Sequence, residues 1–295
     1  MTRATWLNLG RVAFVAVTGF FAWWSLRGRW GEVGDALAAT SVGGVLAGLA
    51  LVLAGLVATG FVWLRLLAAH GHRVPVRGGL SVFFTGQLGK YVPGSVWSIG
   101  VQAKLARRYD VPLRATVGTG LVFLGFHVAT AIVLGGAIAV GGGVDTRLAT
   151  WLLVAGIAVA LVGMAPPVVN RIAAPITPGV RLTWADLGVV LVLMALAWAA
   201  YSLALLALAP DPSPADLAAM TAAFALAYAA GVVIVLAPAG LGAREATFVL
   251  LLAPTTGLVA ASSLAVLARL LHSVADFALA VVAWDTARQE ARGSA

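Results

Sequence analysis

Long apolar stretches recur along this chain, and each is long enough to cross a membrane as a helix. The stretches at 42–64, 115–140, 187–208 and 258–284 contain few charged residues, and a helix needs about 20 apolar residues to span the hydrocarbon core. Charged residues make up only 10% of the chain, whereas a soluble domain has about 25%. The sequence therefore predicts an integral membrane protein.

The apolar stretches are typical of helices rather than of barrel strands. They are continuous, rich in Ala, Leu, Val and Gly, and show no period-2 alternation. We therefore expect an all-α, polytopic transmembrane bundle that forms a single domain over residues 1–295. The basic, apolar N-terminus resembles a signal peptide, but no small-residue cleavage site follows it, so we interpret it as a first span. The six expected spans are 11–26, 42–64, 115–140, 148–169, 187–208 and 258–284.

Two glycine- and proline-rich stretches interrupt the apolar pattern. Residues 86–97 have the sequence GQLGKYVPGSVW, and residues 237–245 have the sequence APAGLGARE. Glycine and proline loosen or break a helix, and backbone groups freed in this way cannot face lipid, where nothing would hydrogen-bond them. We therefore expect both stretches to form re-entrant hairpins whose tips lie inside the protein or line a wet cavity at membrane depth.

The basic residues predict the orientation of the spans. If both broken stretches are hairpins, both termini and most of the 19 Lys and Arg residues fall on one side, which the positive-inside rule assigns to the cytoplasm. If the first broken stretch crossed the membrane once, the Lys and Arg residues would be divided between the two sides. The hairpin is therefore favoured. The polar segment 286–295 is then a cytoplasmic tail. The residues left at the outer side or at membrane depth are Arg27, Arg29, Arg147, Lys90, Arg244 and Arg269.

A shift of 145 residues relates the two parts of the chain. This shift places Pro93 on Pro238 and His127 on His272, and each half has the order span, span, hairpin, span. Three crossings per half would invert the second copy relative to the first. We therefore expect inverted halves at about 1–145 and 146–285, with the two hairpins opposed, which is a transporter design.

Lys90 lies in the first broken stretch, and a charge at membrane depth costs about 2.5–3.5 kcal/mol on insertion scales. Lys90 could bind a lipid phosphate, assisted by Gln87 and by free backbone amides near Gly94 and Ser95. The alternative is that the lysine extends its ammonium to the membrane interface.

Arg244 and Glu245 follow the second broken stretch. We expect a half-helix to begin there, and its free N–H groups attract an anion. Arg244 could hold a phosphate with its guanidinium fork, while Glu245 could neutralise Arg244, accept a proton or hold a cationic headgroup. The alternative is a structural ion pair that closes the hairpin.

The last span carries Arg269, His272 and Asp276 on one face, because they are three and four residues apart. His272 could titrate and couple transport to protons, or the face could be a polar strip that satisfies the broken hairpins. His127 on the third span is more typical of a core histidine. The candidate substrate-binding residues are Gln87, Lys90, Pro93, Gly94, Ser95, Trp97, Pro238, Gly240, Gly242, Arg244, Glu245, Arg269, His272 and Asp276.

The two broken motifs, with Trp97 and the pair Arg244-Glu245, resemble the lysylphosphatidylglycerol synthase transmembrane-region family over nearly the whole chain. That family is similar to the flippase half of the bacterial multiple peptide resistance factor. The resemblance implies movement of an anionic phospholipid or a lipid-linked sugar between leaflets of the bacterial plasma membrane, beside a glycosyltransferase or lipid-modifying enzyme. The resistance factor adds an aminoacyl-transferase domain that has no counterpart in this sequence, so we do not expect lipid aminoacylation.

Two other functions stay open. The Pro-Gly-Ser at residues 93–95 also fits a membrane phosphatase acting on polyprenyl pyrophosphate, and the basic site fits a transporter of a small anionic solute. An enzyme is less favoured, because only Glu245 and Asp276 are carboxylates at depth. We expect no metal and no cofactor, since no cluster has metal-ligand spacing and the chain has no cysteine. The basic residues at span ends indicate contact with lipid headgroups rather than with nucleic acid.

Overall fold

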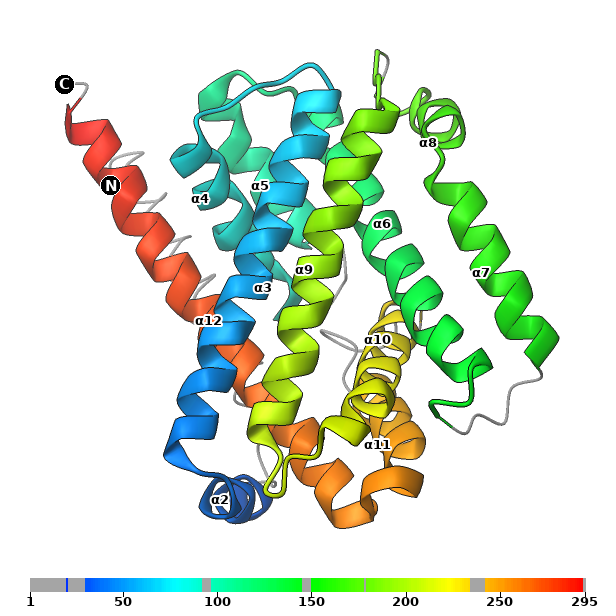
Figure 1. Cartoon of the computed structure of the whole chain (residues 1–295). Helices are drawn as coiled ribbons and strands as arrows, with labels where there is room; N and C mark the ends of the chain where they lie inside the picture. The colour runs from blue at the N-terminus through cyan, green and yellow to red at the C-terminus, as the bar shows by residue number, and fades with distance from the viewer. Residues whose placement is uncertain are drawn as a thin grey trace.

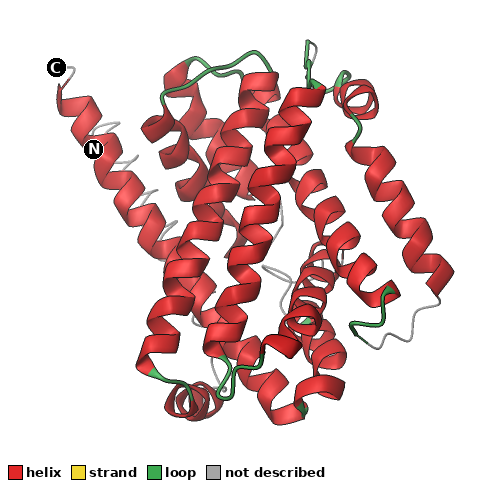
Figure 2. Cartoon of the chain, in the orientation of Figure 1, coloured by secondary structure: helices red, strands yellow, loops and turns green. Residues whose placement is uncertain are grey.

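The computed structural model describes residues 20, 30–91, 97–144, 150–177, 179–233 and 242–293. Over these residues the regular elements are helices and no strand is present (Figure 2), which confirms the all-α prediction. Within the described ranges, five helices are long and apolar enough to cross a membrane, and one bent pair adds a sixth candidate. The protein is therefore a multi-pass membrane protein. The predicted span 11–26 lies outside the described residues except for Phe20.

The helices are labelled in Figure 1 in chain order. Three short 3-10 helices, η1 (Leu88–Tyr91), η2 (Arg107–Tyr109) and η3 (Pro214–Asp216), join or precede longer elements. The α-helices are α2 (Trp30–Ala39), α3 (Val42–Ala69), α4 (Val76–Gln87), α5 (Trp97–Ala106), α6 (Leu113–Val140), α7 (Thr150–Met164), α8 (Pro166–Ala173), α9 (Trp184–Leu208), α10 (Leu217–Val233), α11 (Ala243–Thr256) and α12 (Leu258–Gly293).

Helices α3 and α9 run side by side in opposite directions through the centre of the bundle (Figure 1). Small residues of α3 permit this close approach: a Cβ at Gly44 would meet the carbonyl oxygen of Ala207, and one at Gly55 would meet the Tyr201 ring. At the end where α9 begins, Arg65 of α3 forms an ion pair of 2.5 Å with Asp186. The pair is therefore held by backbone proximity and by one charged contact, as membrane helix interfaces commonly are.

The predicted span 148–169 is not one straight helix. Helix α7 ends at Met164, and α8 leaves it at an angle of 73°. Ala165 has extended backbone, with φ −62° and ψ 132°, because a residue before proline is disfavoured in the helical region. Pro166 then occupies the start of α8, where its missing N–H costs nothing. Over its described residues the predicted span 148–169 corresponds to this bent pair, which together is long and apolar enough to count as a sixth candidate span.

A pair of helices flanks each broken stretch. Helix α4 continues through η1 and packs on α5, and α10 packs on α11. The first pair lies toward one end of the bundle and the second toward the other (Figure 1). A Cβ at Gly89 would lie 2.5 Å from the backbone nitrogen of Ser98, so glycine is what lets η1 touch α5. The re-entrant placement of the two helix pairs in a bilayer stays a prediction, since residues 214–233 are by themselves long and apolar enough to cross the membrane.

The element order repeats after 145 residues. Helices α3, α4, α5 and α6 shifted by this amount fall on α9, α10, α11 and α12, and α6 and α12 run in opposite directions (Figure 1). This order agrees with inverted halves, although the division itself stays a prediction. The predicted polar tail continues α12 as helix as far as Gly293.

Candidate functional site

A cavity of about 280 Å³ lies between the two helical hairpins and the long helices. Its lining residues include Leu56 of α3, His127 of α6, Trp198 of α9 and His272 of α12. Each of these lies within about two residues of the middle of its membrane-spanning helix, or roughly 3 Å at a rise of 1.5 Å per residue. The cavity is therefore at mid-depth in the bundle.

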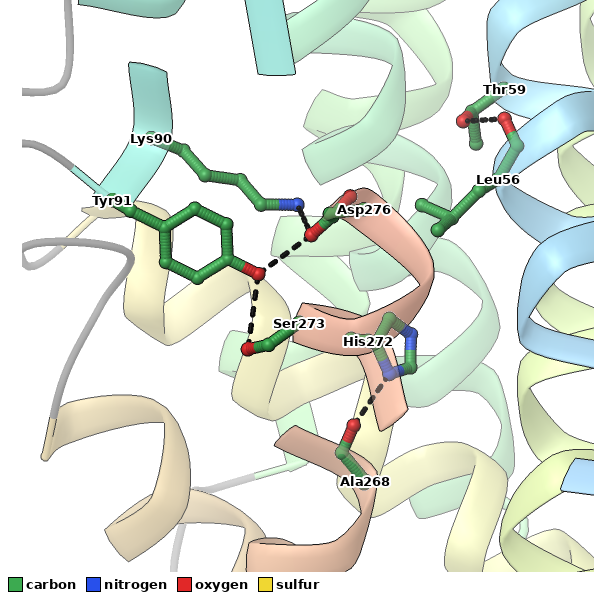
Figure 3. Close-up of polar contacts among 8 residues, drawn as sticks. All are labelled: Leu56, Thr59, Lys90, Tyr91, Ala268, His272, Ser273 and Asp276. Atoms are coloured by element: carbon green, nitrogen blue, oxygen red, sulfur yellow. Dashed lines mark hydrogen bonds and ion pairs between the residues drawn. The ribbon is translucent and has the colours of Figure 1, made fainter. Parts of the chain in front are cut away.

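Lys90 lines this cavity from η1, and its ammonium pairs with a carboxylate that is not part of the lining. Its Nζ lies 2.6 Å from Oδ2 of Asp276 on α12, whose side chain is only 2% exposed. The neighbouring Tyr91 hydroxyl lies 2.7 Å from the same Asp276 oxygen, to which it donates, and 3.1 Å from Oγ of Ser273 (Figure 3). The first hairpin is thus joined to α12 by one ion pair and one tyrosine, rather than presenting a free ammonium.

A second ion pair joins the other hairpin to the same helix. Nη1 of Arg269 donates to Oε1 of Glu245 at 2.5 Å, and both side chains are nearly buried. The second carboxylate oxygen of Glu245 accepts from the backbone N–H of Gly242 at 2.8 Å. Gly242 has a φ of 83°, a region that favours glycine, and it begins α11. Of the roles predicted for Glu245, an ion pair is present, but its partner in direct contact is Arg269 rather than the neighbouring Arg244.

Arg244 lies differently from the other two deep cations. Its guanidinium carbon is 4.8 Å from the centre of the Phe224 ring and 5.9 Å from that of Tyr228. Among the described residues it forms no ion pair, yet it lines the cavity. Aromatic faces stabilise a guanidinium by about 0.5–2 kcal/mol, which leaves its N–H donors available to an anion.

Aromatic side chains form another part of the cavity wall. The His127 ring stacks on Tyr228 with centroids 4.3 Å apart, and Trp198 packs edge-on against the same histidine at 5.3 Å. The His272 ring lies 5.1 Å from that of Tyr201, and its Nδ1 is 2.8 Å from the carbonyl oxygen of Ala268 (Figure 3). This arrangement fixes the orientation of both histidine rings.

The charges of the wall favour an anion. Lys90, Arg244 and Arg269 line the cavity, whereas the carboxylates of Asp276 and Glu245 pair with two of these cations from behind the lining. Nε of Arg269 is buried with no hydrogen-bond partner among the described residues. Unused donors at a cationic surface are what a phosphate oxygen requires.

The structure brings most of the predicted site residues together. Gln87, Lys90, Arg244, Arg269 and His272 line the cavity, Asp276 and Glu245 pair with its cations, and Gly242 begins α11. Trp97 does not line the cavity; its side chain is 52% exposed at the start of α5. The predicted residues outside the described part of the chain are Pro93, Gly94, Ser95, Pro238 and Gly240.

Several cavity residues are absent from the prediction. His127 was expected in the core, and it is buried, but it also lines the cavity. Gln102 of α5 and the aromatic residues Trp198 and Tyr228 were not singled out. A carboxamide, tryptophan and tyrosine inside otherwise apolar helices are a signal that could have found them, since buried polar groups need partners.

The fold and the cavity define a class: a polytopic α-helical membrane protein with two helical hairpins and a cationic cavity at mid-depth. Residues 10–283 match the family described as lysylphosphatidylglycerol synthase TM region, and the chain belongs to that family. Comparison with curated proteins and with solved structures finds no match in either set.

Proposed function

We propose that this protein moves a phosphate-bearing lipid or lipid-linked headgroup between leaflets of the bacterial plasma membrane. The observation that carries the proposal is the mid-depth cavity whose wall presents three cations, one of which forms no ion pair among the described residues. A charged headgroup that crosses the membrane needs a polar cavity at this depth, because placing a charge in the bilayer core costs free energy. Membership of the family agrees with a transport role.

The charged residues suggest an order of events. Phosphate meets Arg244 first, since this guanidinium has no carboxylate partner among the described residues. Lys90 and Arg269 are already oriented toward the cavity by Asp276 and Glu245, and each can share its remaining donors with the phosphate. Because the two ion pairs join opposite hairpins to α12, phosphate binding would loosen one hairpin or the other. Alternate loosening around a fixed site gives alternating access, while the acyl chains remain in the bilayer.

Lipid movement by the reconstituted protein tests the proposal. Purified protein is placed in liposomes that hold a fluorescent phospholipid, and the fraction accessible to a membrane-impermeant quencher is followed with time. We expect Arg244→Ala to slow movement at least tenfold, because removing one charge-assisted contact loses about 1.5–3 kcal/mol of binding. Arg171→Ala on α8 is the matched control, since Arg171 is exposed and does not line the cavity.

The two other functions predict different outcomes. Wild-type protein that moves no envelope lipid of any class tested contradicts the proposal. Uptake of inorganic or organic phosphate into the same liposomes would favour a solute transporter. Release of inorganic phosphate from polyprenyl pyrophosphate would favour a phosphatase.

A further inference from the structure

The proposed function assigns no role to two polar side chains of the cavity wall. Gln102 is 3% exposed and His127 is 7% exposed. Oε1 of Gln102 and Nδ1 of His127 are both buried without a hydrogen-bond partner among the described residues. An unsatisfied buried polar atom costs about 1–3 kcal/mol, so each such atom in a native site calls for an explanation. Both residues line the cavity, where a bound ligand would supply the missing hydrogen-bond partners.

The surroundings of these two residues hold them in place. The backbone of α4 comes so close to Gln102 that a Cβ at Gly86 would collide with its side chain. His127 is held between the Tyr228 ring at 4.3 Å and the edges of Phe123 and Trp198 at 5.5 and 5.3 Å. The carboxamide and the imidazole are therefore each positioned by packing on the wall of the same cavity.

The chemistry of these two side chains selects the ligand. A carboxamide has both donors and an acceptor, and a neutral imidazole has one of each. A hydroxyl group matches both, because it donates and accepts, whereas an ammonium group only donates. An ammonium would also be repelled by Lys90, Arg244 and Arg269, which line the same cavity. Aromatic rings beside the polar pair suit the C–H faces of a polyol.

We propose that Gln102 and His127 form a hydroxyl-binding subsite, so that the headgroup is a phosphate esterified to a neutral polyhydroxyl alcohol rather than to an amine. This inference rests on the proposed function and names the headgroup class for the same cavity. With a volume of about 280 Å³, the cavity is at the lower limit of ligand pockets, roughly 300–1,000 Å³. A headgroup of the size of glycerol or a single sugar fits, and acyl chains remain outside.

Binding to the purified full chain in detergent tests this subsite without requiring lipid movement. The probes are dihexanoyl phosphatidylglycerol, phosphatidylmethanol and phosphatidylethanolamine. The first two have the same charge and differ in the hydroxyl groups, and the third carries an ammonium. We expect the glycerol lipid to bind about tenfold more tightly than the methanol lipid, as two hydrogen bonds predict. The ethanolamine lipid should bind most weakly.

Two near-isosteric variants locate the hydroxyl contacts. His127→Phe keeps the stacking on Tyr228, and Gln102→Met keeps the side-chain length. Each should lower affinity for the glycerol lipid about threefold to tenfold and leave that for the methanol lipid unchanged. Arg244→Ala should weaken both lipids by the same factor. Monodisperse elution and an unchanged melting temperature show that a variant is folded.

Equal binding of the glycerol and methanol lipids by wild-type protein overturns the inference, and so does a variant effect of equal size on both. If His127→Phe fails to fold, the Gln102→Met variant and the binding of the two lipids by wild-type protein still test the hydroxyl-binding subsite. Glycerol 3-phosphate that binds as tightly as the glycerol lipid supports the hydroxyl subsite but contradicts a lipid substrate. Failure of the subsite and failure of the proposed function are thus separated.

Discussion

Lys90 and Asp276 show how single charges are tolerated deep in this protein. The ammonium and the carboxylate are 2.6 Å apart, and Tyr91 satisfies the same carboxylate oxygen. Desolvation makes such a pair a weak source of net stability, yet removing one partner is costly, because it leaves the other charge uncompensated. The pair therefore holds the Lys90 ammonium at the cavity wall. It adds little to the free energy of unfolding, but its loss by substitution of one partner lowers that free energy.

Substitution of one partner of this pair should be more harmful than substitution of both. We expect Asp276→Asn to destabilise the protein by about 3 kcal/mol, at the lower end for buried pairs, because Lys90 is one-third exposed. The double variant Lys90→Gln with Asp276→Asn should recover at least half of this loss. Thermal unfolding in detergent measures both. Equal destabilisation by the single and double variants would show that the ion pair is not the interaction lost.

At the scale of elements, glycine decides how the first hairpin packs. Gly89 of η1 lies against the backbone of Ser98, and Gly86 of α4 lies against Gln102. The same stretch brings Lys90 and Tyr91 to the cavity. The same glycines thus let α4 and η1 approach α5 closely and position Lys90 and Tyr91 at the cavity. Polar and small residues commonly hold membrane helices together in this way.

Two glycines of this hairpin should respond oppositely to alanine. Gly89→Ala would place a Cβ 2.5 Å from the Ser98 nitrogen, so we expect a loss of about 1–3 kcal/mol from overpacking. Gly100→Ala on α5 is the matched control, because nothing lies within 4 Å of its Cβ, and it should be neutral or stabilising by up to about 1 kcal/mol. Melting temperatures of the two variants in detergent test this. Unchanged stability of Gly89→Ala would contradict the packing role of this glycine.

For the whole molecule, the basic segments collect at one end of the bundle. The ends of α3 and α5, helix α8 and the start of α9 lie there together (Figure 1), and the backbone N–H of Arg181 donates to the carbonyl oxygen of Ala69 at 3.0 Å. Segments far apart in the sequence thus share one basic surface. By the positive-inside rule, we expect this surface to face the cytoplasm.

Single cysteines test this orientation cleanly, because the chain has none of its own. We place one at the basic end with Arg107→Cys and one at the opposite end with Asp211→Cys, both at exposed positions. A membrane-impermeant maleimide should label Asp211→Cys in intact cells and Arg107→Cys only after permeabilisation. The reverse pattern would show that the protein is inserted the other way round.

Hydropathy along the chain is sufficient to locate the long membrane-spanning helices. The predicted spans 42–64, 115–140 and 187–208 differ from α3, α6 and α9 by five residues or fewer at either end, because long apolar stretches have one stable form in lipid. Glycine and proline likewise marked the breaks. These are local properties of the chain, and local rules of hydropathy and backbone geometry are sufficient to read them.

The contacts between polar groups follow from the packing of the helices and could not be predicted from the sequence. Tyr91 and Asp276 are separated by 185 residues yet share a hydrogen bond. Glu245 pairs with Arg269 rather than with its neighbour Arg244, and His127 reaches the cavity although its sequence context suits the core. Apolar burial is non-directional and so fixes depth but not partners. Partners depend on how helices that are far apart in the chain pack, and Lys90 and Arg269 each pair with the carboxylate that this packing brings within reach.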